Sequence, residues 1–186
     1  MNPSDPIQKI LPIESALIAL VPEADGLVET FRKRYDPSAV LVFPAHVTIL
    51  YPFKPPEELT GEVTRVLEEL FQTIPNFRVS FLEMRRFPDV LYLAPVPDEP
   101  FKTLTETVVK HFPDMQPYGG EVEEVVPHLT IDQISNPKRM EAIAPDDQES
   151  IRGLLPIHHR VEAVTLMDNA SGSWQVRTNF PLGKAY

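Results

Sequence analysis

Cysteine is absent from the sequence, and glycine is scarce, with seven residues among 186. The lack of cysteine excludes disulfides, thiolate metal ligands, cysteine-held iron–sulfur clusters and thiol nucleophiles, and it is consistent with the cytoplasm. Neither of the glycine-rich phosphate loops, G-x-G-x-x-G or G-x-x-x-x-G-K-[ST], occurs. The G-x-S-x-G elbow of serine hydrolases is also missing, and Ser171-Gly172-Ser173 lacks its context. The familiar motifs for nucleotide binding and covalent catalysis are therefore not available to this chain.

Long apolar runs and an excess of positive charge are missing as well. No apolar stretch approaches the roughly 18 residues that cross a bilayer, and Lys9 is the only early lysine, which argues against a signal peptide. The formal net charge is −10, whereas binding to long nucleic acids depends on many lysines and arginines. We therefore expect no membrane partner and no long duplex nucleic acid, although one or two phosphates could still bind in a local pocket.

The sequence is otherwise typical of a globular protein. The hydrophobic fraction is 42% and the mean hydropathy is −0.15, which fits a folded chain of one domain. We expect a polar lead-in over residues 1–10 and a single two-lobed domain over residues 11–186. The patterns predict strands over 15–21, 40–53, 77–87, 90–96, 122–134, 161–167 and 174–180, and helices over 23–35, 57–74, 99–112 and 137–154, the last interrupted near Pro145.

The most informative feature is a repeated triplet in an apolar setting. His46-Val47-Thr48 and His128-Leu129-Thr130 each follow a proline closely and precede an isoleucine. Side chains at positions i and i+2 of a strand point to the same face. Each strand therefore presents one imidazole and one hydroxyl, while Val47 and Leu129 point into the core. The order of elements around the two triplets repeats weakly, which favours an α+β fold of two sheet-bearing lobes.

Two imidazoles and two hydroxyls suit a phosphodiester. Histidine has the side-chain pKa nearest neutrality, so one neutral ring can remove a proton from the nucleophile while a protonated ring donates one to the leaving oxygen. Threonine hydroxyls can donate hydrogen bonds to the non-bridging phosphate oxygens. Such a site needs neither a metal nor a cofactor.

The two triplets, their separation of about 80 residues and the flanking P-A-H-V-T-I-L-Y-P-F resemble the two-histidine phosphoesterase superfamily. Within it the chain is most similar to the 2'-5' RNA ligase-like proteins and their cyclic phosphodiesterase relatives. The closing segment V-T-L-M-D-N…W-Q-V…F-P-L-G resembles the C-terminal strands of that family.

The resemblance implies an α+β, bilobal fold with two mainly antiparallel sheets related by a pseudo-two-fold, helices on the outside and a central cleft. It implies that His46 and His128 are the general acid and base, without saying which is which, and that Thr48 and Thr130 hold the phosphate. The implied substrates are 2',3'-cyclic phosphates or 2'-5' linkages of nucleotides or RNA ends. The resemblance also implies that the reaction uses no metal. We expect a cytoplasmic monomer.

Other residues carry weaker expectations. Tyr118, in the Tyr118-Gly119-Gly120 loop, is a candidate to contact a bound base, and Trp174 is expected in the core. Tyr51 is expected on the strand face opposite His46. Asp132 would share the face of His128 if that strand were regular, which is unfavourable beside a phosphate. The remaining histidines, His111, His158 and His159, are expected to be structural.

Two alternatives stay open at this point. His46, His128 and Asp132 could form a two-histidine, one-carboxylate metal site, although no tight ligand spacing supports it. The chain could also be a non-catalytic nucleotide- or phosphate-binding module of the same fold.

Overall fold

The computed structural model describes residues 12–35, 43–121, 124–133 and 145–184, with no account of some side chains inside these ranges. The predicted lead-in over residues 1–10 lies outside this part. The strands are β1 (Ser15–Leu20), β2 (His46–Leu50), β3 (Phe77–Arg86), β4 (Val90–Val96), β5 (Leu129–Gln133), β6 (Ile157–Val161), β7 (Ala163–Asp168) and β8 (Gln175–Pro181). The α-helices are α1 (Asp25–Tyr35), α2 (Gly61–Gln72), α3 (Glu99–His111) and α5 (Pro145–Leu154), and short 3-10 turns span Pro22–Ala24, Pro56–Glu58 and Pro117–Gly120.

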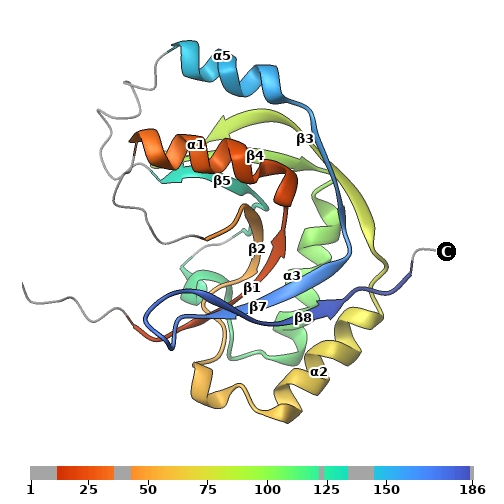
Figure 1. The fold of residues 1–186 in the computed structure, drawn as a ribbon. Helices are drawn as coiled ribbons and strands as arrows, with labels where there is room; N and C mark the ends of the chain where they lie inside the picture. Colours follow the sequence, from red (N-terminus) through yellow and green to blue (C-terminus); the bar gives the residue numbers. More distant parts are fainter. Residues whose placement is uncertain (1–11, 36–42, 122–123, 134–144, 185–186) are drawn as a thin grey trace, which may run out of the picture.

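The strands form one antiparallel sheet that is curled into a half-barrel (Figure 1). Its order is β6-β3-β4-β5-β2-β1-β7-β8. The α+β class and the antiparallel strands are confirmed, with one correction: the two expected sheets are joined through β2 and β5 into a single sheet of eight strands. The two halves still match, because β2 is followed outward by β1, β7 and β8, and β5 by β4, β3 and β6.

The helices tie the two halves together. The chain passes from β1 through α1 to β2, and from β4 through α3 to β5. Each of these helices packs on the central strand of the other half: α1 lies against β5, and α3 lies against β2. Helix α2 packs against β8, and α5 packs against β3. Figure 1 shows α1 and α5 over the β3–β5 half and α2 at the opposite end of the molecule.

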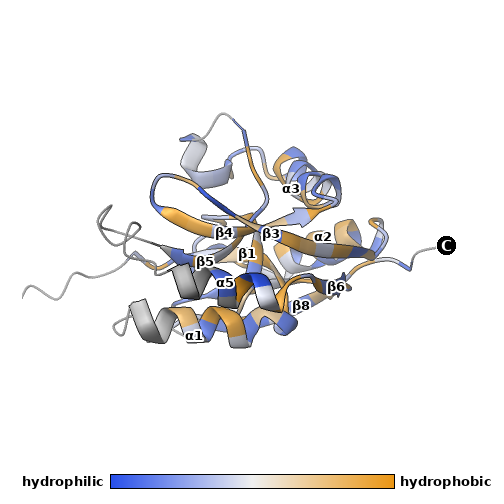
Figure 2. Cartoon of the chain, turned by 90° about the horizontal axis from the view of Figure 1, so that it is seen from above, coloured by the Kyte–Doolittle hydropathy of each residue, from blue (hydrophilic) through white to orange (hydrophobic). Residues whose placement is uncertain are grey.

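Local signals explain the helices. Helix α2 is preceded by Thr60, whose side chain accepts a hydrogen bond from the Val63 amide, as helix-capping residues do. Its buried face contains Leu67 and Phe71, four residues apart. The Pro100 ring occupies the first turn of α3, where its missing amide hydrogen costs nothing. Hydrophobic residues accordingly concentrate in the strands at the middle of the molecule, whereas hydrophobic and hydrophilic residues alternate along the helices (Figure 2).

Several predicted elements differ in extent. The motif strands are shorter than predicted within the described residues, because β2 begins at His46 and β5 at Leu129. The strand predicted over 161–167 is β7, which begins two residues later, and Glu162 separates it from β6. Strand β6 gives a weak sequence signal, because its alternation consists of only two buried apolar residues, Ile157 and Val161, around the segment His158–Arg160. In the described part of the chain, no helix is long and apolar enough to cross a membrane.

Gly183 fastens the C-terminal end of the chain to the turn after α2. Its amide donates to the Ile74 carbonyl at 2.8 Å, and its own carbonyl accepts from the Asn76 amide at 2.8 Å. A Cβ atom at Gly183 would lie 2.4 Å from the Gln72 carbonyl oxygen. The Gly183 backbone therefore lies too close to the Gln72 carbonyl for any side chain to fit between them, so this position requires glycine.

We expect Gly183→Ala to lower the free energy of unfolding by about 1–3 kcal/mol, because the added methyl group forces the backbone apart. Urea denaturation measures the effect. Gly61→Ala is the matched control, since nothing lies within 4 Å of a Cβ atom there, and it should be neutral or stabilising. Equal stability of the two variants would contradict the close approach.

Candidate active site

The two triplets meet at the centre of the sheet. Val47 of β2 lies directly opposite Leu129 of β5 in an antiparallel pair, and both side chains are fully buried in the main core. Continuing this antiparallel register by one position on either side sets His46 opposite Thr130, and Thr48 opposite His128. We call these four side chains the His/Thr square. Opposed residues in such a ladder have Cβ atoms about 5 Å apart, and diagonal ones about 7–8 Å.

All four members of the His/Thr square are partly exposed, in contrast to their buried neighbours in sequence. The predicted alternation of faces within each triplet is therefore confirmed. The square places an imidazole and a hydroxyl on each strand, with like groups on the diagonals. This spacing suits a tetrahedral anion such as a phosphate, which can meet both imidazoles from opposite sides.

The two histidines are oriented by equivalent hydrogen bonds. His46 Nδ1 lies 2.7 Å from the Pro44 carbonyl oxygen, and His128 Nδ1 lies 2.8 Å from the Val126 carbonyl oxygen. Because a carbonyl oxygen only accepts, Nδ1 carries the hydrogen in both rings. The lone pair of each neutral ring is therefore on Nε2. In both halves Nε2 is therefore the ring nitrogen that does not bind this carbonyl, and it can act as a base when neutral and as an acid when protonated.

The surroundings of His128 are apolar and aromatic. Its ring makes edge-to-face contacts with Phe87 and Tyr92, at centroid distances of 5.3 Å and 5.5 Å, and these two rings stack on each other at 4.3 Å. Burial lowers the pKa of His128 from its ordinary value of 6.5, and the hydrogen bond to Val126 offsets this only in part. Desolvation disfavours the charged imidazolium, so His128 is neutral at neutral pH.

A second aromatic group extends from His46. Phe43 contacts the His46 ring at 4.6 Å and Trp174 at 4.9 Å, and Trp174 contacts Tyr51 at 6.2 Å. These aromatic residues cover a small apolar cluster of Ala16, Ile18 and Met167, separate from the main core. Trp174, which was expected in the core, thus packs in this second cluster on the face of the His/Thr square.

Each motif strand has a bulge at the isoleucine after the triplet. In β2 the partner of Thr48 is Ile18, but the partner of Leu50 is Leu17, so Ile49 is an extra residue. In β5 the partner of Thr130 is Tyr92, but the partner of Asp132 is Leu91, so Ile131 is an extra residue. A bulge of this kind reverses the alternation of faces beyond it. The α3 residue Thr105 donates to the Ile49 carbonyl at 2.7 Å and stabilises the bulge in β2.

The bulges correct two predictions. Asp132 was expected on the face of His128, but it lies opposite Leu91, a core residue, and is therefore on the core face, 7% exposed. Tyr51 was expected on the face opposite His46, but it lies beyond the bulge and contacts Trp174 on the same side as the His/Thr square. Its hydroxyl donates to Glu14 at 2.5 Å, and burial together with this carboxylate raises the pKa of Tyr51 to about 12.

The alternative metal site of two histidines and one carboxylate is not supported, because the bulge in β5 turns Asp132 to the core face. Asp132 is on the wrong face to join His46 and His128, and the described residues contain no group of three side chains arranged to bind a metal. The other histidines lie elsewhere: His111 bonds the Thr107 carbonyl at the end of α3, His158 bonds Ser80, and His159 contacts Glu23.

Tyr118 lies next to the His/Thr square. Its amide donates to the Tyr51 carbonyl at 2.7 Å, and burial raises the pKa of its hydroxyl, an effect that the neighbouring Thr48 side chain partly offsets. The turn at Tyr118 is thus hydrogen-bonded to the residue that follows β2, and the expected contact of Tyr118 with a bound base stays a prediction. The aromatic neighbours of the histidines were not singled out from the sequence, where Phe43, Phe87 and Tyr92 read as ordinary strand residues.

Comparison with known proteins identifies the family. Residues 20–173 match the family model of the 2'-5' RNA ligase superfamily. The chain belongs to this superfamily. Two curated relatives are described as candidate phosphoesterases: one from Bacillus licheniformis is 27% identical over 84% of this chain and 90% of its own length, and one from Bacillus pumilus is 25% identical over 85% and 90%.

Solved structures agree on the fold. A protein of Thermus thermophilus superposes with a TM-score of 0.62 at 18% identity, covering 93% of this chain and 100% of its own. E. coli LigT in its apo form superposes with a TM-score of 0.60 at 16% identity, covering 93% and 99%. LigT has also been solved with 3'-AMP and with phosphate. The fold of the 2'-5' RNA ligase superfamily is thus shared over nearly the whole chain.

The burial of His128 predicts a lowered pKa that can be measured. We expect the His128 ring to titrate below 6.5, and Phe87→Ala to raise the midpoint toward that value because water then reaches the ring. An NMR titration of the histidine ring protons measures both. Tyr92→Phe keeps the aromatic contact and serves as the control, with the native midpoint expected. A Phe87→Ala midpoint equal to or below the native one would contradict the role of burial.

The position of Asp132 leads to a second prediction. The carboxylate is buried and has an interaction partner, so Asp132→Asn should lower the free energy of unfolding by about 1–3 kcal/mol. Because it lies on the far face of the strand, the same change should leave the affinity for inorganic phosphate within about twofold. Calorimetry measures both quantities. A large gain in phosphate affinity would instead place the carboxylate beside the anion.

Proposed function

We propose that the chain is a metal-free phosphodiesterase that acts on 2',3'-cyclic phosphates or 2'-5' linkages of nucleotides or RNA ends. The observation that carries this proposal is the His/Thr square: two imidazoles with equivalent tautomers and two hydroxyls, brought together on one face by the pairing of Val47 with Leu129. The structures of LigT with 3'-AMP and with phosphate support a small phosphate ester as the ligand.

The roles of the two histidines follow from their surroundings. His128 is neutral at neutral pH because it is buried between Phe87 and Tyr92, so its Nε2 accepts the proton of the attacking water. His46 is then the group that protonates the leaving oxygen. The water oxygen bonds to phosphorus as the bond to one ribose oxygen breaks, and the product is a phosphomonoester beside a free hydroxyl. At the end of the reaction His128 holds the proton that His46 has lost, and exchange with solvent restores both.

Thr48 and Thr130 are the phosphate-binding residues in this proposal. Negative charge gathers on the non-bridging oxygens in the transition state, and a hydroxyl donor on each strand stabilises it. The carboxylate of Asp132 does not oppose this, because it points to the core. A 2'-5' linkage would be cleaved by the same pair when the adjacent 3' hydroxyl attacks phosphorus and the 5' oxygen leaves, which gives a 2',3'-cyclic phosphate. Ligation would be the reverse of this transfer.

The substrate in this proposal is small. The net charge of −10 disfavours long duplex nucleic acid, whereas the aromatic group of Phe43, Trp174 and Tyr51 beside His46 offers an apolar surface to a nucleoside. A nucleotide or the terminus of an RNA strand meets both conditions.

The test is hydrolysis of a 2',3'-cyclic nucleotide in excess EDTA. We expect turnover with a bell-shaped pH profile, and a loss of at least about 100-fold in kcat for His46→Ala and for His128→Ala, because general acid–base catalysis contributes about 10²–10⁴-fold. His158→Ala, which changes an exposed histidine on the edge strand β6, is the matched control and should retain native turnover.

Each other outcome has a distinct meaning. Full activity in either single variant would contradict the mechanism, and loss of activity with EDTA would favour a metal-dependent reaction. Binding of the cyclic nucleotide without hydrolysis by the native chain would favour the alternative of a phosphate-binding module.

A further inference from the structure

The sheet on either side of the His/Thr square differs in chemistry. In the half that contains His46, Thr48 pairs with Ile18 of β1, and Ile18 pairs with Thr165 of β7. Ile18 is fully buried, and Thr165 is 2% exposed, with its hydroxyl donating to Asn179 at 2.7 Å. Two strands away from the motif threonine, this half therefore ends in a buried hydroxyl that already has a partner.

The equivalent position in the other half is an arginine. Thr130 pairs with Tyr92 of β4, and Tyr92 pairs with Arg85 of β3. Directly opposed residues of an antiparallel pair lie on the same face, and the Tyr92 ring contacts the His128 ring. Arg85 is thus on the face of the His/Thr square. Because neighbouring strands are about 4.8 Å apart, the Arg85 backbone lies about 10 Å from that of Thr130.

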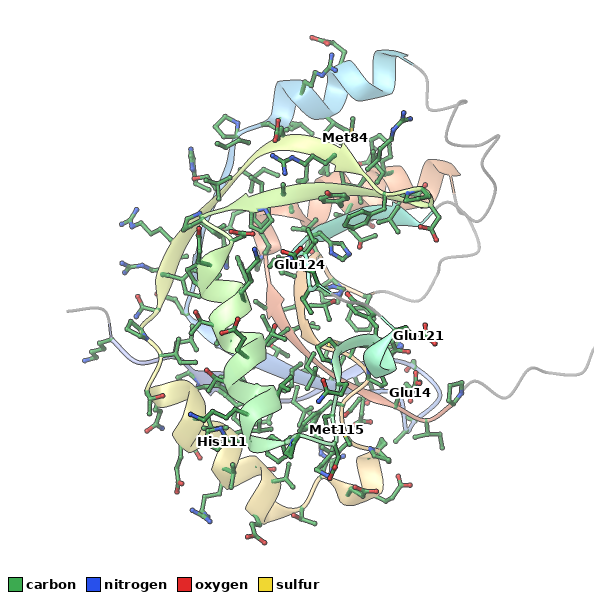
Figure 3. All side chains as sticks on the ribbon, turned by 180° about the vertical axis from the view of Figure 1, so that it is seen from behind. Glu14, Met84, His111, Met115, Glu121 and Glu124 are labelled. Carbon is green, nitrogen blue, oxygen red and sulfur yellow. The ribbon has the colours of Figure 1, made fainter. Side chains whose placement is uncertain are left out.

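Figure 3 shows how the two halves lie relative to each other. Met84, which precedes Arg85, is at one side, Glu14 at the start of β1 is at the other, and Glu124, in the connection to the second motif, is between them. A ligand in the His/Thr square therefore has the buried groups of β1 and β7 toward one side and a guanidinium toward the other.

A bulge in β3 determines the direction of the arginine. Between the pairs formed by Phe81 and Met84, β3 has one more residue than β4. Phe81 is buried in the main core, and Met84 packs against that core. In a strand without the extra residue, Glu83 and Arg85 would continue the alternation of Phe81 and would point into the core. The bulge instead turns both charged side chains to the face of the His/Thr square.

The guanidinium of Arg85 is exposed and bound by one carboxylate oxygen. Arg85 Nε donates to Glu83 Oε1 at 2.6 Å, and Nη2 is paired with the same oxygen. A guanidinium has five N–H donors in a planar fork, so most of them remain for a second anion. The two side chains are 58% and 56% exposed, and exposed ion pairs of this kind are weak. A phosphate can therefore bind Arg85 without the loss of a buried contact.

We propose that Arg85 is a second phosphate-binding residue, which holds the 5' phosphate of the nucleotide whose 2' oxygen is attached to the phosphate in the His/Thr square. This inference rests on the proposed function, in which the same histidine pair cleaves a 2'-5' linkage. His128 then removes the proton of the attacking 3' hydroxyl, and His46 protonates the leaving 5' oxygen. The attacking nucleotide lies on the side of His128, and its own 5' phosphate is the next one along the strand, toward β4 and β3.

This site makes the preferred substrate a 2'-5' linkage that continues on its 5' side. The leaving nucleoside lies on the side of His46, where the aromatic group of Phe43, Trp174 and Tyr51 is. The attacking nucleotide adds a second phosphate, and bidentate pairing with phosphate is the geometry that a guanidinium favours. An RNA strand of at least two phosphates thus fits the two sides better than a single nucleoside phosphate does.

Glu83 has the opposite effect in this proposal. Its carboxylate occupies part of the Arg85 fork and repels an incoming phosphate, so its removal should strengthen binding of the second phosphate. An ion pair that only stabilised the hairpin would predict the same small loss for either partner. Glu83→Gln and Arg85→Gln therefore distinguish the two roles by the direction of their effects.

The experiment compares two 2'-5' dinucleotides that differ only in a 5' phosphate. Calorimetry gives Kd for their 3'-deoxy forms, which lack the attacking hydroxyl, and kcat/KM is measured in EDTA for the reactive forms. We expect the native chain to bind the 5'-phosphorylated form roughly tenfold more tightly, in the range of a charge-assisted hydrogen bond. Arg85→Gln should abolish this preference in Kd and in kcat/KM and leave the unphosphorylated form within about twofold. Glu83→Gln should increase the preference by about two- to fivefold.

The ion pair of Arg65 and Glu69 on α2 is the matched control. It has the same chemistry, with a distance of 2.6 Å and side chains that are 59% and 64% exposed. Arg65→Gln and Glu69→Gln should change neither Kd by more than about twofold, and thermal unfolding of each variant checks that the chain remains folded. Equal losses for both dinucleotides in Arg85→Gln would overturn the second phosphate site, as would weaker binding of the phosphorylated form by Glu83→Gln.

The binding measurement separates this inference from the proposed reaction. If the native chain cleaves neither dinucleotide in EDTA, the proposed cleavage of 2'-5' linkages fails, but Kd still reports on Arg85. A preference for the 5' phosphate that is lost in Arg85→Gln supports the second phosphate site. Equal binding of the two forms by the native chain overturns it, whatever the turnover.

Discussion

The pairing of Val47 with Leu129 is the contact on which the candidate site depends. It joins two four-stranded halves into one sheet, and its antiparallel sense sets each histidine opposite the threonine of the other strand. A slip of one residue would turn all four polar side chains into the core and both apolar ones out. Burial of Val47 and Leu129, worth about 1.5–3 kcal/mol for each side chain, opposes that slip. The helices act in the same direction, because α1 and α3 each pack on the central strand of the other half.

The two bulges determine what surrounds this pairing. Because Ile49 and Ile131 are extra residues, the strands return to the core face at Leu50 and Asp132. Without the bulge in β5, a carboxylate would stand two positions from Thr130 on the same face, where it would repel an anion. Without the bulge in β2, the Tyr51 side chain would point away from Trp174, and the Tyr51 carbonyl would not be oriented to accept the hydrogen bond from the Tyr118 amide. The bulges therefore keep the Asp132 carboxylate away from the site and give the turn at Tyr118 a point of attachment.

Much of this arrangement could be predicted from the sequence. Alternation in His46-Val47-Thr48 and in the second triplet was enough to predict the shared faces, because the intervening Val47 and Leu129 are apolar. The bulges could not be predicted, because Ile49 and Leu50 are both apolar and fit a regular strand equally well. A bulge also depends on how a strand pairs with its neighbours, and the sequence alone does not show that pairing. The extent of strand β6 was also hard to predict, since its polar segment His158–Arg160 lies on a sheet edge and shows little apolar pattern. The union of the two halves into one sheet likewise depends on a single pair of residues far apart in the chain.

The repeat and the departures from it have different consequences. The repeated features, an Nδ1 hydrogen bond to a carbonyl two residues back and a hydroxyl two residues on, make the two histidines chemically equivalent. Two equivalent imidazoles have no preferred direction of proton transfer, whereas acid–base catalysis needs one neutral ring and one protonated ring. In the proposed mechanism a difference in their surroundings supplies that direction: Phe87 and Tyr92 enclose His128 and favour its neutral form, whereas the ring of His46 contacts Phe43. The duplicated core thus brings the two imidazoles together, and under the proposed function the residues that differ between the two halves assign a role to each.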